Sequence, residues 1–131
     1  MIVLETSALV AALLGEAERP RIVAALSADP HVVISAVSRY EALVVLRGKG
    51  VIADPEAEVD ALLRSVGAEI IAFDAAQSSL AFAANARFGK GSGSAARLNL
   101  ADCAAYALAI LKAAPLLYTG GDFAQTDIAA A

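Results

Sequence analysis

The chain has few of the residues that small proteins use as covalent or nucleophilic groups. Its 131 residues include one cysteine, one histidine and no tryptophan. A single cysteine, Cys103, cannot form an internal disulfide, so a reducing, cytoplasmic location is expected. The lone histidine, His31, opens an expected strand and is predicted to be structural or exposed. No convincing set of serine, cysteine and histidine for nucleophilic catalysis is present.

Long uninterrupted apolar runs are missing as well. The first residues contain no basic stretch and are interrupted by Glu5, which is not the pattern of a signal peptide. The segment Leu100–Tyr118 most resembles a membrane span, but it contains Asp102, Lys112 and Pro115. A buried helix followed by a strand is therefore expected there, and no membrane association is predicted.

Positive charge is scarce, with ten Lys and Arg against 14 Asp and Glu and a net charge of −4 at pH 7. Taken alone, this balance argues against a nucleic-acid partner, because phosphate binding usually leaves a basic footprint. The distribution matters more than the sum. Two short segments concentrate basic residues: Arg39, Arg47 and Lys49 in one, and Arg87, Lys90 and Arg97 in the other. The second segment is either a phosphate contact for RNA or a solvated loop.

Apolar residues dominate what remains, at 59% against 18% charged, which is typical of one globular domain spanning residues 1–131. Short apolar runs alternate with segments that have helix caps and stops. Strands are expected at 2–4, 31–34, 69–73 and 116–118. Helices are expected at 7–14 with Thr6 as its N-cap, 20–28, 36–47, 55–66, 75–88 and 100–113.

This alternation indicates an α/β fold with a mostly parallel, twisted sheet of four or five short strands and helices on both faces. In such folds, binding sites form outside the carboxyl ends of the strands. Four acidic residues are expected near that edge because they follow strands or begin helices. They are Glu5, Glu41, Asp102 and Asp122.

Each of these acids also has a purely structural interpretation. Ser38 and Glu41 match a capping box, and Asp102 lies near a helix N-terminus, where the macrodipole stabilises a carboxylate. Asp122 fits a turn, and Glu5 fits the exposed end of a strand. These alternatives remain open for each residue taken singly.

The helical neighbours of two of the acids favour a shared site. Residues three and four positions from Glu41 and from Asp102 are largely apolar, which places both carboxylates on core-facing stripes. Buried carboxylates are costly and repel one another, and a divalent cation relieves both problems. Oxygen ligands without histidine or cysteine favour Mg²⁺ or Mn²⁺ over zinc. Such a metal activates water against a phosphodiester.

Several segments together resemble a known family. They are Glu5–Leu9 after the first strand, Arg87–Gly91, Ala96–Cys103, Ala105–Ala109 and Pro115–Ile128. The first resembles the opening of PIN-domain proteins, and the others resemble the second half of VapC-type toxins. The match covers nearly the whole chain in order, and its run from Leu98 to Ile128 is the most specific part.

The resemblance implies a PIN-like three-layer sandwich and the toxin of a type II toxin–antitoxin pair. Such a toxin is a divalent-metal-dependent endoribonuclease that a VapB-type antitoxin neutralises. A homodimer or a toxin–antitoxin hetero-oligomer is implied. Carried over by position, Glu5, Asp102 and Asp122 are metal ligands, and Glu41 completes the acidic set. Thr6 or Ser7 positions water or phosphate, although a plain N-cap is the simpler role for Thr6. No direct metal bond is assigned to Asp127, in the same tail.

The chain departs from the family at Glu5, where the resemblance calls for Asp. The charge is kept, but the side chain is one methylene longer, and Mg²⁺ tolerates poor geometry badly. The chain is then either a natural variant with a retuned site or a weakened form of the toxin. In both cases we predict low ribonuclease activity that Glu5→Asp raises. The alternative is a PIN-like module that binds RNA or protein without catalysis.

Two other classes fit less well. A phosphoacceptor receiver domain has a similar size, with Asp74 as a conceivable acceptor, but its acidic pair and lysine are missing. The glycine-rich segment 89–94 matches neither the dinucleotide fingerprint nor the P-loop order.

Overall fold

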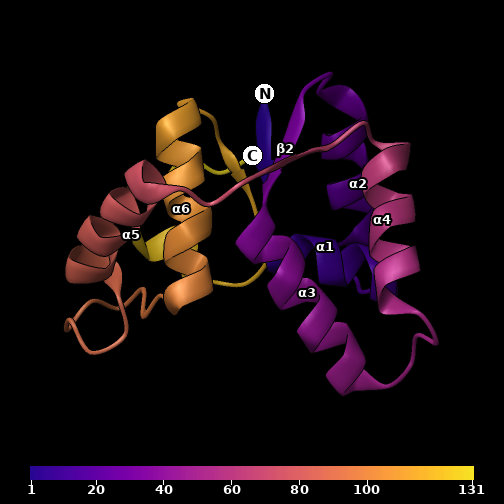
Figure 1. Cartoon of the computed structure of the whole chain (residues 1–131), viewed down its shortest axis with the longest axis horizontal. Coiled ribbons are helices and arrows are strands. Elements are labelled where there is room, and N and C mark those ends of the chain that lie inside the picture. The colour runs from indigo at the N-terminus through magenta and orange to yellow at the C-terminus, as the bar shows by residue number, and fades with distance from the viewer.

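The computed structural model describes residues 1–131 and consists of a central sheet between two groups of helices (Figure 1). The sheet has four parallel strands in the order β3-β2-β1-β4. They are β1 (Ile2–Leu4), β2 (Val32–Ser35), β3 (Glu69–Ile71) and β4 (Leu116–Leu117). The helices are α1 (Thr6–Leu14), α2 (Arg19–Ala28), α3 (Ala36–Lys49), α4 (Pro55–Ser65), α5 (Ala75–Phe88), α6 (Leu100–Lys112) and the short 3₁₀ helix η1 (Phe123–Gln125). The predicted α/β class with a parallel sheet is confirmed.

Alternation along the strands divides the core into two layers. Neighbouring residues of a strand point to opposite faces of a sheet, so strands buried on both faces are apolar throughout. One face contributes Ile2, Leu4, Val32, Ile34 and Leu117 to a core shared with α1, α2, α3 and α4. The other contributes Val3, Val33 and Leu116 to a core with α5, α6 and the C-terminal tail. Figure 1 shows these two helical groups on either side of the strands.

The start of α1 differs from the prediction. Thr6 was expected to be the N-cap, but it is the first helical residue, and Glu5 occupies the capping position. The backbone N–H of Ser7 donates to Glu5 Oε2 at 2.7 Å. Glu5 can do this because its backbone is still extended, with φ −104° and ψ 159°, as β1 ends. The same residue therefore ends the strand and caps the helix.

The boundaries of α3 also differ. Ser35, not Ser38, is its N-cap, with the N–H of Val37 donating to Ser35 Oγ at 3.2 Å. The helix continues through Gly48 to Lys49 and is capped by Gly50, whose φ of +69° is the left-handed conformation that favours glycine. The capping-box interpretation of Glu41 is consequently wrong, since Ser38 lies inside the helix.

Two strands are shorter than expected, and the tail contributes to the sheet edge. β3 ends before Ala72, whose carbonyl accepts a hydrogen bond from Gln77 Nε2 at 2.7 Å instead of pairing with a strand. The backbone N–H of Leu116 in β4 donates to the carbonyl of Ala129 at 2.9 Å, which anchors the chain terminus beside β4.

No helix combines the length and apolar character that crossing a bilayer requires.

Candidate metal centre

Three acidic side chains from different parts of the chain meet at the carboxyl edge of the sheet. Glu5 follows β1, Glu41 lies in the second turn of α3, and Asp102 lies in the first turn of α6. One carboxylate oxygen from each lies within 4.8 Å of the other two. They line a pocket of about 260 Å³ together with Thr6 and Ser7, among others. The convergence arises because parallel strands all end at the edge where the following helices begin.

Glu5 is the most deeply buried of the three, with 2% of its surface exposed. Burial raises the pKa of its carboxyl from 4.5 to about 7, although hydrogen bonds from the Ser7 hydroxyl and backbone N–H oppose the rise. The charges of Asp102 and Glu41 add to the increase. The expectation that Glu5 is the exposed end of a strand is therefore wrong. Glu5 is a buried acid whose carboxylate accepts hydrogen bonds from Ser7.

Asp102 has both of the roles considered for it. Its Oδ2 accepts from the backbone N–H of Asn99 at 2.9 Å, and Asn99 Oδ1 accepts from the N–H of Asp102 at 2.8 Å, forming a capping box. Capping engages Oδ2, so Oδ1 is available to a ligand. Burial, followed by the charges of Glu41 and Asp122, raises the pKa of Asp102 to about 6.

Glu41 completes the cluster from a half-buried position on α3. The three carboxylates of the cluster form no ion pair, because every salt bridge of the chain involves other residues. Three mutually repelling carboxylates without a basic partner are unfavourable unless protons or a cation neutralise them. All the donors are oxygens, which is the ligand chemistry of Mg²⁺ and Mn²⁺. The residues present therefore fit a hard divalent cation.

Asp122 lies outside this group of three. It is exposed and immediately precedes η1, with no capping hydrogen bond from its side chain. Its charge nevertheless raises the pKa of Asp102, which places it on the same side of the molecule. Asp122 therefore lies beside the cluster and not in it. Its assignment as a metal ligand remains a prediction.

The two hydroxyl residues after Glu5 connect the site to its surroundings. Thr6 Oγ1 donates to the carbonyl of Ser38 at 3.2 Å, which ties the start of α1 to α3. Ser7 Oγ donates to Glu5 and accepts from the backbone N–H of Thr119 at 2.9 Å. Ser7 thereby couples the Glu5 carboxylate to the end of β4. Contacts of either hydroxyl with water or phosphate remain predictions.

The basic residues expected to contact RNA differ in their surroundings. Arg87 forms an ion pair with Asp127 at 3.0 Å, and its guanidinium lies 4.5 Å from the centre of the Phe88 ring. Lys90 and Arg97 are exposed on the loop between α5 and α6, and neither forms a salt bridge. Lys90 and Arg97 are therefore the basic residues of this segment that have no acidic partner.

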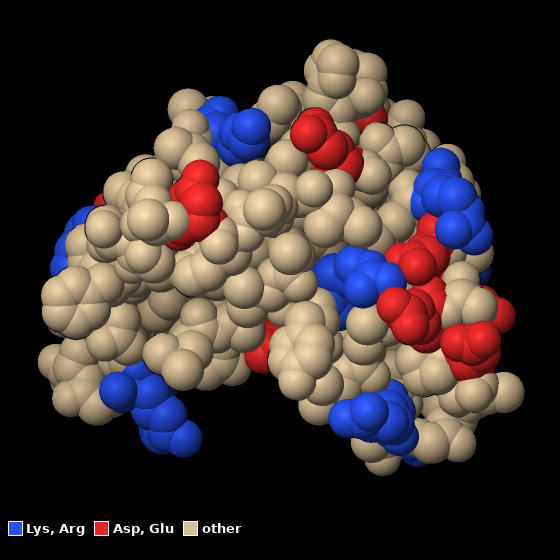
Figure 2. All heavy atoms as spheres, viewed as in Figure 1, with Lys and Arg blue, Asp and Glu red and all other residues tan.

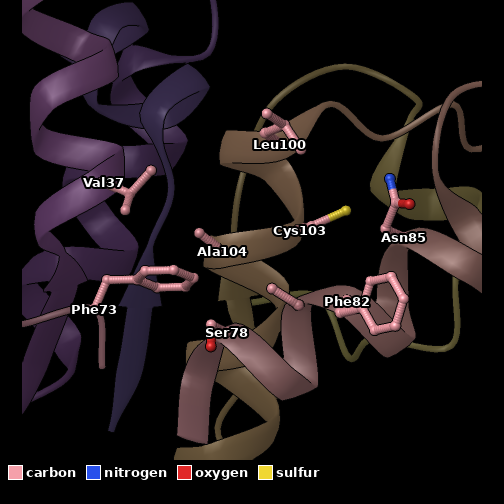
Figure 3. A pocket seen from close by; sticks show the side chains of 9 residues that line it. Val37, Phe73, Ser78, Phe82, Asn85, Leu100, Cys103 and Ala104 are labelled. Carbon is pink, nitrogen blue, oxygen red and sulfur yellow. The ribbon is translucent and has the colours of Figure 1, made fainter. Parts of the chain in front are cut away.

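A second cleft, which sequence reasoning missed, lies between α3, α5 and α6. It has a volume of about 350 Å³ and a mainly apolar lining. In Figure 3, Val37 and Ala104 point toward one another across it, and the Phe73 ring points into it. Phe82 and Leu100 at its rim are 77% and 84% exposed. The sequence feature that could have indicated this cleft is the presence of two large apolar residues, Phe82 and Leu100, at outward-facing positions of expected helices.

The comparisons with known proteins agree with this architecture. A model of the PIN domain matches residues 2–129. The chain belongs to the PIN-domain family. Among PIN-domain relatives, ribonuclease VapC42 of Mycobacterium tuberculosis is 38% identical over 128 residues, covering 96% of this chain and 95% of the relative. Ribonuclease VapC of Mycolicibacterium smegmatis is 37% identical over 129 residues, covering 98% of each chain.

Solved structures of other PIN-like toxins share the fold. The M. tuberculosis toxin VapC20, described as cleaving the sarcin–ricin loop, superposes with a TM-score of 0.80 at 18% identity, covering 100% of this chain and 98% of that one. A toxin–antitoxin complex from Klebsiella pneumoniae gives a TM-score of 0.70 at 21% identity, covering 95% and 91%. The predicted resemblance to VapC-type ribonuclease toxins is confirmed. Asp74, the conceivable acceptor of a receiver domain, is the N-cap of α5 and accepts from the N–H of Gln77 at 2.9 Å.

Proposed function

We propose that Glu5, Glu41 and Asp102 bind a divalent cation, Mg²⁺ or Mn²⁺, at which this VapC-type toxin hydrolyses RNA phosphodiester bonds. The observation that supports the proposal is the approach of three carboxylate oxygens to within 4.8 Å without a basic partner. When bound, such a cation supplies an activated water and neutralises charge on the phosphodiester. Asp122 lies beside the cluster and adds negative charge to it.

The protein's own groups hold this site in place. Ser7 holds the Glu5 carboxylate through its hydroxyl and its backbone N–H. The Asn99 capping box fixes Asp102 on the first turn of α6. Positions fixed by local hydrogen bonds cost little reorganisation when a ligand binds, which is the condition for preorganised catalysis.

The charge distribution supports RNA as the substrate despite the net negative charge. Figure 2 shows acidic atoms at the head of a notch between two lobes, and basic side chains near the lower edge on both sides. One basic group lies over the loop that follows α5, which carries the exposed Lys90 and Arg97. An RNA backbone crossing the notch would meet cations before and after the acidic site. Because RNA is the substrate, we place the activity in the cytoplasm.

Glu5 sets the level of activity in this proposal. Its carboxylate is buried and bound by Ser7, and it is one methylene longer than the Asp expected at this position. An octahedral Mg²⁺ site is sensitive to such a change. We therefore propose activity that is present but low, and higher with Mn²⁺ than with Mg²⁺.

We also propose a cognate VapB-type antitoxin as partner, with a homodimer when the antitoxin is absent. Support comes from the Klebsiella neighbour, which is a toxin–antitoxin complex. Further support comes from the rim of the apolar cleft, where Phe82 and Leu100 expose large side chains. Figure 2 shows a broad central area without charged side chains on the face that it draws. Exposed apolar patches of this kind mark protein-binding surfaces.

The test is cleavage of a structured RNA by purified protein with Mn²⁺, with Mg²⁺ and with a chelator. We expect metal-dependent cleavage that Asp102→Asn abolishes, while Glu58→Gln, which changes an exposed acid on α4, leaves it intact. Cleavage that continues in the chelator, or in Asp102→Asn, contradicts the proposal. RNA binding without cleavage under every condition favours the alternative of a non-catalytic binding module.

A further inference from the structure

A polar clamp joins the C-terminal tail to the helical pair α5–α6. The hydroxyl of Tyr106 on α6 donates to Asp127 Oδ1 at 2.6 Å. Arg87 Nη2, at the end of α5, donates to Asp127 Oδ2 at 3.0 Å. Both oxygens of one carboxylate are thus engaged by two different helices. The Phe88 ring packs beneath, 5.7 Å from the Tyr106 ring, and completes the clamp.

The tail segment between Asp122 and Asp127 is internally braced. Phe123 is 3% exposed, and its ring lies 5.2 Å from that of Tyr118. Thr126 Oγ1 donates to the carbonyl of Phe123 at 2.6 Å, which closes the turn around η1. The backbone N–H of Gln125 also donates to the carbonyl of Asp122 at 3.2 Å, so hydrogen bonds connect the segment along its length from Asp122 to Thr126.

One end of this segment is bound to α6, the helix that carries the cluster residue Asp102, and the other end follows a loop that is bound to the metal-site pocket. Asp102 and Tyr106 are four residues apart on α6 and therefore share one face of the helix. Tyr106 holds Asp127 at one end of the segment. Before its other end, the backbone N–H of Thr119, three residues ahead of Asp122, donates at 2.9 Å to the hydroxyl of Ser7, which lines the same pocket as the cluster. The tail thus runs from the pocket of the carboxylate cluster to Tyr106 on α6.

We propose that Asp127 is a positioning residue that, through Tyr106 and Arg87, holds the Asp122 carboxylate beside the metal site. The clamp also assigns Arg87 a role different from RNA binding. Its guanidinium is occupied by Asp127 and the Phe88 ring, while Lys90 is left for the phosphate backbone. This inference rests on the proposed metal site and names a residue that acts on it indirectly.

The first test measures Mn²⁺ affinity by calorimetry on the full chain, without RNA. One unit charge about 10 Å from a divalent cation in a water-like dielectric changes affinity roughly fourfold. We expect Asp122→Asn and Asp127→Asn each to weaken Mn²⁺ binding by about this factor. Because Asp127 acts through Asp122, the double variant should bind no more weakly than Asp122→Asn alone. Tyr106→Phe, which removes only the hydroxyl, should resemble Asp127→Asn, and Asp127→Glu should recover part of the affinity.

Three calorimetric outcomes overturn the proposal. They are wild-type affinity in Asp127→Asn, multiplicative losses in the double variant, and no Mn²⁺ binding by the wild type. The last also refutes the proposed metal site. If Mn²⁺ binds with the expected pattern but the wild type cleaves no RNA, only the ribonuclease assignment fails. Glu58→Gln is the matched control, and circular dichroism establishes that each variant is folded.

The second test separates the two roles of Arg87. It measures the binding of a non-cleavable, 2′-O-methylated RNA oligomer at several salt concentrations. A side chain that contacts phosphate contributes about one to the slope of log affinity against log salt. We expect Arg87→Ala to leave the slope unchanged and Lys90→Ala to reduce it. A slope reduced by about one in Arg87→Ala overturns the assignment of Arg87 to the clamp.

Discussion

The buried Glu5 carboxyl should make the metal-free protein less stable as the pH rises. Its pKa is raised from 4.5 to about 7, chiefly by burial. The folded protein therefore keeps a proton that the unfolded chain releases. Stability from this group is fully present below pH 4.5 and is lost progressively as the pH rises through about 7. With 1.36 kcal/mol per pH unit, the loss amounts to about 3 kcal/mol.

Glu5→Gln is the perturbation that isolates this effect. The amide cannot ionise, and its oxygen still accepts from the backbone N–H of Ser7. At pH 8 the variant should unfold with a free energy about 3 kcal/mol above that of the wild type, and near pH 4.5 the difference should nearly vanish. A shallower dependence should remain in the variant, because the pKa of Asp102 is also raised, to about 6.

The assay is urea unfolding followed by circular dichroism in a chelator at several pH values between about 4.5 and 8. Glu16→Gln, which changes an exposed acid, is the control and should follow the wild type. Mn²⁺ at about 100 times its dissociation constant should stabilise the wild type at pH 8 by about 2.7 kcal/mol, and Glu5→Gln by much less. Equal pH profiles for wild type and Glu5→Gln would refute the burial argument.

Three further predictions concern activity, helix capping and the partner surface. Glu5→Asp should raise Mn²⁺-dependent RNA cleavage, measured as kcat/KM, by about tenfold or more; a rate no higher than that of the wild type contradicts the view of Glu5 as an ill-fitting ligand. Asn99→Ala should lower the free energy of unfolding by about 1 kcal/mol, since it removes the N-cap of α6; urea unfolding that matches the wild type excludes this contribution. Phe82→Ser should weaken binding of the co-expressed antitoxin by about tenfold or more in calorimetry while RNA cleavage is retained; undiminished antitoxin binding would place the partner on another face.

Much of the fold could be predicted because its signals are local. The apolar runs at β1 and β2 indicated strands buried on both faces, and the expected helix starts at residues 55 and 100 agree with α4 and α6, whose N-caps are Asp54 and Asn99. Errors arose where two residues compete for one role. At the start of α1, the choice between Glu5 and Thr6 as N-cap depends on where the backbone leaves the extended conformation. Propensity alone does not decide that.

The candidate site could be predicted in part. Helical spacing indicated that Glu41 and Asp102 lie on core-facing stripes, and both belong to the observed cluster. Glu5 and Asp122 were expected near the same sheet edge because they follow strands, and the family resemblance added their role as metal ligands; only Glu5 lies in the group of three. Asp122 differs because the braced tail holds it outside the pocket, and Arg87 differs because Asp127 engages it. Contacts made by a folded tail leave no periodic signal in the sequence.

The residue types and their spacing by themselves determined the α/β class, the parallel sheet and the all-oxygen chemistry of the candidate metal site. They did so because burial, helix period and ligand chemistry are properties of short segments. Only the tertiary structure decided that Glu5 is both a helix cap and a buried acid with a raised pKa. It alone decided that Asp127 ties the tail to α5 and α6. Those facts depend on distances between segments remote in the chain, which packing across the sheet sets.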